Sequence, residues 1–195
     1  MSKRIRKKEK QKQAQAGTLN IRELWQEKKQ ILLLALAFAV LMGIFYGFWF
    51  SEIFMTNILE PVVKANAFVA SKMLNLFGFD SIASGSNINS STTSFSVSIK
   101  NGCDALEPVA IFTFIVLLAP VSLNSKLRGM ATGIPLLLLL NQLRIISLYI
   151  FGIYSPFLFE LFHVQVWQAI FIVITLMILV YWVVWAVGKE RKTQQ

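Results

Sequence analysis

Long uncharged apolar runs dominate the pattern of hydrophobic and polar positions along the chain. The first run, 31–51, contains no charged residue in 21 positions, which is enough for one membrane crossing at about 1.5 Å of rise per residue. Bulky aromatic residues end this run where a signal peptide would carry a small-residue cleavage site, so it predicts an uncleaved anchor. Further runs predict crossings at 104–121, 130–152 and 161–188.

The segment between the first two crossings has a mixed pattern. Apolar residues recur at helical spacing over 52–79, but charged residues and Pro61 interrupt them. This pattern predicts one or two amphipathic helices at the outer membrane surface, kinked near Pro61, with a short extra crossing as the alternative. Ser, Asn, Thr and Gly are frequent over 80–94, which predicts a loop. Apolar and polar residues then alternate over 94–100, which predicts a short half-buried strand.

Composition supports an all-α integral membrane protein with about four transmembrane helices, because 55% of the residues are hydrophobic and they gather in these runs. The formal net charge of +9 comes mainly from basic residues that precede the first run. Residues 1–20 are typical of a disordered tail, and 21–30 of an interfacial helix. A basic tail beside an anchor favours retention in the cytoplasm and contact with anionic membrane lipid, rather than binding of nucleic acid.

The distribution of basic residues predicts the orientation. Fifteen of the nineteen Lys and Arg residues fall before the first crossing, in the turn 122–129, or after the last crossing. Only three lie in the segments expected on the other side, so both termini are expected in the cytoplasm. The predicted organisation is a cytoplasmic tail and interfacial helix (1–30), an anchor (31–51), an extracytoplasmic segment with amphipathic helices and a short β segment (52–102), a three-helix membrane core (103–188) and a cytoplasmic tail (189–195).

Three chemically distinctive residues converge on one boundary in this topology. Cys103, the single cysteine, opens the second crossing after a polar stretch, and His163, the single histidine, opens the fourth from the same side. Arg144 lies about 21 Å along the third crossing, which runs toward that side. All three are therefore expected in the outer third of the membrane.

An arginine inside a membrane helix needs a partner, because it costs about 2.5–3.5 kcal/mol at the helix centre. The candidate partners are the carboxylates of Asp104, Glu107 and Glu160, or the thiolate of Cys103. Two further placements follow from helical spacing: Asn141 lies three residues before Arg144 and on the same face, and Glu160 lies three residues before His163, where it could hold the imidazole.

The chemistry of this set favours a nucleophilic thiol. A neighbouring cation lowers the pKa of a cysteine toward a reactive thiolate, a histidine can move its proton, and an arginine can stabilise an oxyanion. One cysteine and one histidine without carboxylate ligands do not form a zinc site, and the sequence contains no glycine-rich phosphate loop, so we expect neither metal nor cofactor. The residues alone predict a membrane-embedded site for thiol acyl transfer.

The sequence resembles the exosortase/archaeosortase family of multi-pass membrane cysteine transpeptidases. The resemblance rests on Asn101-Gly102-Cys103-Asp104-Ala105-Leu106-Glu107 at the head of a crossing, on Asn141-x-x-Arg144 in the next, and on His163 opening the one after. It covers about 95–182. It implies catalytic roles for Cys103, Arg144 and His163, with Asn141, Asp104, Glu107 and Glu160 as supporting residues. Many members have Cys-Ser-Gly where this chain has Cys-Asp-Ala, which implies a divergent member or a small subfamily.

The resemblance also implies a substrate and a location. Members recognise a C-terminal sorting tail on exported proteins, cleave it, and transfer the new C-terminus to an acceptor. The expected location is the cell (inner) membrane of a prokaryote, with an extracytoplasmic active site. Two alternatives remain open, an intramembrane cysteine protease that uses water as the acceptor and a non-enzymatic membrane scaffold for surface export. The sequence predicts no particular oligomeric state.

Overall fold

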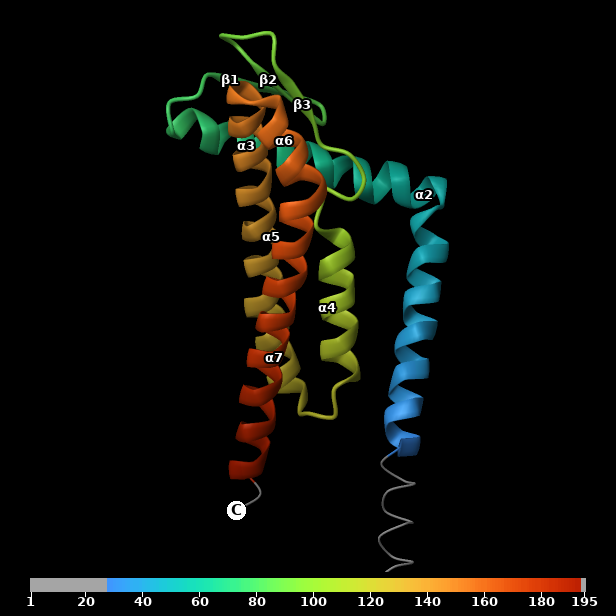
Figure 1. Ribbon diagram of the computed structural model, residues 1–195. Coiled ribbons are helices and arrows are strands. Elements are labelled where there is room, and N and C mark those ends of the chain that lie inside the picture. The colour runs from blue at the N-terminus through green and yellow to red at the C-terminus, as the bar shows by residue number, and fades with distance from the viewer. Residues whose placement is uncertain (1–27, 194–195) are drawn as a thin grey trace, which may run out of the picture. The chain divides into compact units, whose positions relative to one another are not determined.

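The computed structural model describes residues 28–193 (Figure 1). The predictions for the basic tail and for most of the interfacial helix therefore lie outside the described residues. The chain divides into two units, 1–43 and 44–195. The described part of the first unit is helical and belongs to the helix Lys28–Trp49, which is long and apolar enough to cross a membrane, as the uncharged run predicts.

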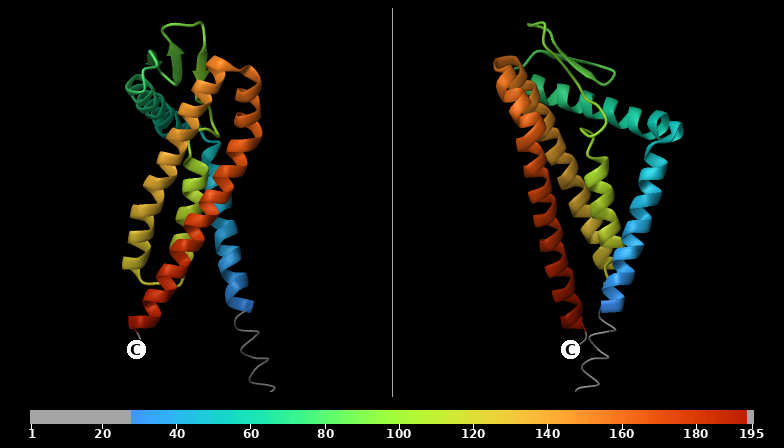
Figure 2. Two further views of the ribbon diagram at one scale, coloured as in Figure 1. Left: turned by 60° about the vertical axis from the view of Figure 1, so that its left-hand side comes forward. Right: turned by 45° about the vertical axis from the view of Figure 1, so that its right-hand side comes forward.

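Two long helices form the main body of the second unit. α5 (Leu123–Tyr154) has 32 residues, and α7 (Trp167–Thr193) follows α6 (Pro156–Leu161) and a π-helical turn, η2 (Phe162–Val166). Each of the stretches Leu123–Tyr154 and Pro156–Arg191 is long and apolar enough to span a bilayer. α5 and α7 pack along each other in Figures 1 and 2.

The helix that follows Cys103 is shorter than predicted. α4 (Leu106–Leu118) has 13 residues, or about 20 Å at 1.5 Å per residue, against a hydrocarbon core of about 30 Å. It ends before Ala119-Pro120, where proline cannot continue a helix without losing a backbone hydrogen bond. α4 packs against α5 through Phe112 and Val116, which are fully buried.

A continuous helical segment connects the first helix to the sheet. It consists of α2 (Glu52–Phe54), the π-helical turn η1 (Met55–Leu59) and α3 (Glu60–Leu76). By length and composition Glu52–Leu76 is a fourth candidate span, in place of the shorter α4. It nevertheless runs crosswise to α5 and α7 (Figures 1 and 2), as expected for a helix that lies along a membrane surface.

The predicted kink near Pro61 takes the form of the widened turn η1. Pro61 occupies the first turn of α3, where its missing N–H is tolerated. The π-helical turn lies directly before it. The helix therefore passes Pro61 without breaking.

The segment predicted as a loop contains two strands. β1 (Ser81–Ser84) and β2 (Asn87–Ser90) pair antiparallel around a turn with Gly85 at φ +61°, and β3 (Ser96–Ser98) adds to β2. The loop prediction was wrong because specific hydrogen bonds hold polar residues such as the buried Ser81, and the apolar residues that the sheet buries are few, Ile88 and Val97. The strand predicted at 94–100 is confirmed as β3.

Two further boundaries differ from the prediction. The expected turn at 122–129 is helical from Leu123 onward, and Nζ of Lys126 donates to the carbonyl of Leu117 near the end of α4 (2.6 Å). The expected loop at 153–160 is helical except at Ser155, which is extended and caps α6 by accepting from the N–H of Leu158. The fold is the predicted helical membrane architecture with a small sheet.

Candidate active site

The loop 99–105 joins β3 to α4 and carries Cys103. Asp104 shapes it, because its carboxylate accepts the backbone N–H groups of Gly102 (3.0 Å) and Leu106 (2.7 Å) and is 1% exposed. Gly102 (φ +90°) and Ala105 (φ +69°) both adopt left-handed backbone, which costs about 1–2 kcal/mol for alanine. Bonds to a buried carboxylate therefore hold this loop in a conformation that its backbone alone would not favour.

Cys103 lies beside His163. The Sγ atom of Cys103 is 3.7 Å from Nε2 of His163, although the two residues are 60 positions apart. His163 belongs to η2, and π-helical turns are frequent at functional sites. Its ring stacks on Phe159, with centroids 5.4 Å apart and an interplanar angle of 15°. The sequence-predicted thiol and imidazole are therefore in contact.

Arg144 reaches the same loop but finds a carbonyl and not an acid. Its Nη1 donates to the carbonyl oxygen of Gly102 at 3.3 Å, and the residue is 7% exposed. Its Nε is buried and has no hydrogen-bond partner among the described residues. Within residues 28–193 the structure pairs neither Asp104, Glu107 nor Glu160 with Arg144 in an ion pair. The carbonyl of Gly102 is thus the hydrogen-bond partner of Arg144, for which the sequence had offered a carboxylate or the thiolate of Cys103.

Two more side chains hold the loop carbonyls. Asn141, on the face of α5 that carries Arg144, donates its Nδ2 to the carbonyl of Cys103 (3.1 Å). Asn66 of α3 donates to the carbonyl of Asp104 (3.3 Å), and Gln142 of α5 donates to Oδ1 of Asn66 (2.7 Å).

Sequence reasoning missed Asn66 and Gln142. The available signal was the helical spacing, because Asn66 lies three residues after Val63 and four before Ala70, on the face that α3 buries. A buried amide of this kind requires hydrogen-bond partners.

In the described structure neither Glu107 nor Glu160 makes a hydrogen bond or ion pair with the partners proposed for it. Glu107 accepts a short hydrogen bond from the hydroxyl of Tyr46. Glu160 is exposed, and no hydrogen bond or ion pair joins it to His163 in the described part of the chain. The ring of His163 packs on Phe159 instead. Stacking on this ring therefore orients the imidazole, the role that was expected of Glu160.

Burial reverses the expected effect on the thiol. Cys103 is only partly exposed, and this burial raises the pKa of its thiol, an effect that the Arg144 guanidinium opposes and the Asp104 carboxylate strengthens. Burial also raises the pKa of Asp104, while its hydrogen bonds to backbone N–H groups lower it. The prediction of a pKa lowered by neighbouring cations was wrong because desolvation of the thiolate outweighs the attraction of Arg144. Burial therefore favours the protonated thiol of Cys103 over the thiolate.

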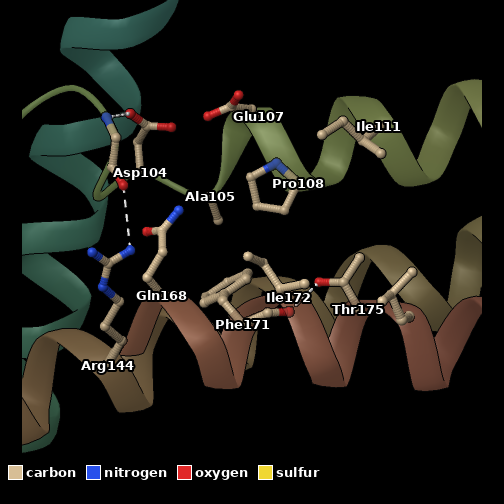
Figure 3. Close-up of a pocket in the computed structure, with 12 residues that line it drawn as sticks. Asp104, Ala105, Glu107, Pro108, Ile111, Arg144, Gln168, Phe171, Ile172 and Thr175 are labelled. Atoms are coloured by element: carbon tan, nitrogen blue, oxygen red, sulfur yellow. Dashed lines mark hydrogen bonds between the residues drawn. The ribbon is translucent and has the colours of Figure 1, made fainter. Parts of the chain in front are cut away.

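A cavity of about 320 Å³ opens next to the loop, between α4 and α7 (Figure 3). One end is polar, with Arg144 and Asp104, and Gln168 of α7 points toward the loop between Arg144 and Ala105. The remainder is mainly apolar. The lining residues are Gly102, Asp104, Ala105, Glu107, Pro108, Ile111, Arg144, Gln168, Phe171, Ile172, Thr175 and Leu176.

The fold and the site define a class, namely helical multi-pass membrane proteins in which a thiol, an imidazole and a guanidinium meet at one loop. The family model described as transmembrane exosortase (Exosortase_EpsH) matches residues 28–186. The chain belongs to the transmembrane exosortase family, a family of membrane cysteine peptidases and transpeptidases. Neither a curated protein nor a solved structure gives a significant match to the chain.

Proposed function

We propose that this protein is a cysteine-dependent transpeptidase that cleaves the C-terminal sorting tail of exported proteins and passes them to an acceptor. The observation that carries the proposal is the 3.7 Å contact between Sγ of Cys103 and Nε2 of His163, beside the buried Arg144. Family membership supports a transmembrane sortase-like enzyme. The residue roles below are part of the proposal.

The first step forms a thioester. Nε2 of His163 takes the proton of the Cys103 thiol while Sγ attacks the scissile carbonyl carbon, and the carbonyl oxygen becomes an oxyanion. Proton transfer accompanies the attack because burial raises the pKa of the thiol. Arg144 lines the cavity beside the loop and offers its guanidinium charge to the oxyanion. The C–N bond then breaks, His163 returns the proton to the leaving amine, and the N-terminal fragment stays on Sγ.

The second step releases the product. An amine or hydroxyl of the acceptor attacks the thioester carbonyl while His163 takes its proton. Collapse of the oxyanion breaks the C–S bond, and the thiolate of Cys103 recovers the proton from His163. With water as the nucleophile the same residues would act as a protease, so the acceptor alone separates these two activities.

The cavity suits a polypeptide that combines polar and apolar residues. Arg144 and Gln168 offer N–H donors to backbone or side-chain oxygens at the end of the cavity lined by Gly102 and Asp104, the neighbours of Cys103 in the chain. Apolar residues such as Ile111 and Phe171 continue the cavity between α4 and α7. A tail whose cleavage motif precedes a membrane helix fits this order.

We further propose that the enzyme lies in the cell membrane of a prokaryote, in contact with lipid, with the N-terminus in the cytoplasm and loop 99–105 on the other side. The asymmetry of Lys and Arg supports this orientation. Topology reporters fused after Ser90 and after Ser155 are expected to report the extracytoplasmic side, and one after Ser125 the cytoplasm. A cytoplasmic signal from the Ser90 fusion would contradict the orientation.

The activity is tested by co-expressing the enzyme with exported proteins that end in a short motif, a membrane helix and a basic cluster. Mass spectrometry of the processed product is expected to show the N-terminal fragment plus the mass of an acceptor. A fragment extended only by water would indicate the protease. Unchanged processing with Cys103→Ala would indicate the scaffold, in which the cysteine is incidental.

A further inference from the structure

Three consecutive backbone carbonyls of the loop, those of Gly102, Cys103 and Asp104, each accept a hydrogen bond from a side chain outside it. The first two donors come from α5, but the third is Asn66 on the crosswise helix α3. We propose that Asn66 and Gln142 are positioning residues that fix the peptide group after Asp104, the residue next to Cys103, and so keep the sulfur of Cys103 directed at His163. The catalytic meaning of this role rests on the proposed function.

The polarity of the hydrogen bonds gives the two amides a fixed order. A backbone carbonyl can only accept, so the Nδ2 of Asn66 must face Asp104 and its Oδ1 must face away. That oxygen receives Nε2 of Gln142 at 2.7 Å. Both side chains are 8% exposed, which keeps water from competing for these bonds. Gln142 therefore orients Asn66, and Asn66 holds Asp104.

The bonds act on both sides of the nucleophile. Arg144 holds the carbonyl of Gly102 before Cys103, and Asn66 holds the carbonyl of Asp104 after it. Gly102 has left-handed backbone and no side chain, so the loop would gain rotational freedom if these bonds were lost. Misplacement of a reacting group by about 1 Å costs about 100-fold in rate. Fixing the loop is therefore a kinetic requirement for the Cys103–His163 pair.

α3 provides a firm support for this arrangement. At its far end Ser71 and Asn75 bind Ser81 at the start of β1. The side-chain hydrogen bonds of Asn75 in the described structure all join it to Ser81, at 2.8–3.0 Å. Asn75→Ala is thus a matched control, because it removes an amide that stabilises the same helix but leaves the loop carbonyls bonded.

The single cysteine of the chain makes the test specific, since a thiol reagent has one target in the full-length protein. The measurement is the alkylation rate of Cys103 by iodoacetamide in membranes, with and without the substitution His163→Ala. Loss of the histidine is expected to slow alkylation about tenfold in the wild-type background, as general-base assistance is removed. In Asn66→Ala and in Gln142→Ala this difference should shrink to less than about twofold, because sulfur and imidazole are no longer aligned. Asn75→Ala should keep the full difference.

A tenfold effect of His163→Ala that survives in both Asn66→Ala and Gln142→Ala would overturn the proposal, as would its disappearance in Asn75→Ala. If Asn66→Ala fails to insert into the membrane, Gln142→Ala alone tests the proposal. This variant keeps Asn66 and removes only the hydrogen bond that Gln142 donates to its amide oxygen. Processing assays separate this question from the enzymatic one. If Cys103→Ala still processes substrate, the proposed function fails while the alkylation result still decides whether Asn66 and Gln142 position Cys103.

Discussion

The two ends of α5 are fastened to their neighbours in different ways. Toward the C-terminal end, here called the loop end, Asn141, Gln142 and Arg144 donate hydrogen bonds to the loop or to Asn66. Toward the N-terminal end, the glycine end, close packing of glycines against aromatic rings accompanies a few polar contacts, such as the bond from Nε1 of Trp182 to the carbonyl of Ser125 (3.1 Å). A Cβ atom at Gly129 would lie 2.1 Å from the ring of Trp182. One helix is thus held to its neighbours by side-chain hydrogen bonds at the loop end and by close contact of glycines with aromatic rings at the glycine end.

The cavities next to the two ends differ in the same way. The cavity at the loop end has a volume of about 320 Å³ and gathers Arg144, Asp104, Glu107 and Gln168. The cavity at the glycine end has a volume of about 650 Å³, and Arg128 is the one charged residue among its lining residues in the described structure. Hydrogen bonds fix direction, whereas close packing fixes only volume. Substitutions at the loop end should therefore change reactivity more than stability, and substitutions at the glycine end the reverse.

The largest effect is expected at Cys103. Cys103→Ala should abolish processing while the protein still inserts, because the sulfur is small and partly exposed. Cys103→Ser should be nearly inactive, since a hydroxyl is a much poorer nucleophile. Immunoblots of a co-expressed substrate report processing, and the membrane fraction of the variant serves as the control. Wild-type processing by Cys103→Ala would show that the site at the loop end does not catalyse the reaction.

The second largest effect on processing is expected at Arg144. Arg144→Lys keeps the charge but cannot both bind the carbonyl of Gly102 and present further N–H donors in a plane. It is expected to insert normally and to lose at least about tenfold in processing rate, equivalent to about 1.4 kcal/mol of transition-state stabilisation. Initial rates at equal enzyme amounts check this. Full activity would reduce Arg144 to a structural residue.

At the glycine end the expected cost is in stability. An added methyl at Gly133 would lie 2.2 Å from the ring of the buried Phe112, so Gly133→Ala should destabilise the protein by about 1–3 kcal/mol through overpacking. Thermal unfolding in detergent measures this, and processing per folded molecule should be unchanged. Gly47→Ala is the control, because among the described residues nothing lies within 4 Å of its added Cβ. A stable but inactive Gly133→Ala would break the contrast between the two ends.

The smallest effect concerns pH. Because burial raises the pKa of Cys103, the thiolate fraction and the alkylation rate should rise only above the usual thiol range, near pH 8.5. Arg144 opposes this rise, so Arg144→Gln should move the midpoint of alkylation to higher pH. A midpoint below that of a free cysteine would show that burial is not the dominant cause, and a downward shift in the variant would show that Arg144 does not lower the pKa of Cys103.

The membrane topology inferred from the distribution of Lys and Arg was enough to predict that Cys103, Arg144 and His163 lie close together. The structure places Cys103 against His163 and Arg144 on the adjoining carbonyl. Hydropathy also predicted the long spans, because an uninterrupted apolar run has few alternatives in a membrane. The ends of the helices were harder to predict from the sequence. Polar residues such as the cap Ser155 and Lys126 are also frequent in loops, so their presence does not distinguish a helix end from a loop.

The contacts that hold the loop could not be predicted from the sequence. Asn66 is separated by 38 residues from Asp104 and by 76 from Gln142, so no local spacing joins them. The hairpin at 81–90 depends on one buried isoleucine, Ile88, within a polar stretch. The direction of the shift in the pKa of Cys103 depends on its degree of burial, which the positions of charges along the chain do not reveal.

The central claim is that Cys103 carries the substrate as a thioester. The most direct measurement is mass spectrometry of the Cys103 peptide after co-expression with a tail-bearing exported protein. The expected result is an adduct with the mass of the N-terminal substrate fragment, which hydroxylamine removes and which His163→Ala strongly reduces. Processed substrate without any adduct on Cys103, together with full processing by Cys103→Ala, would contradict the account.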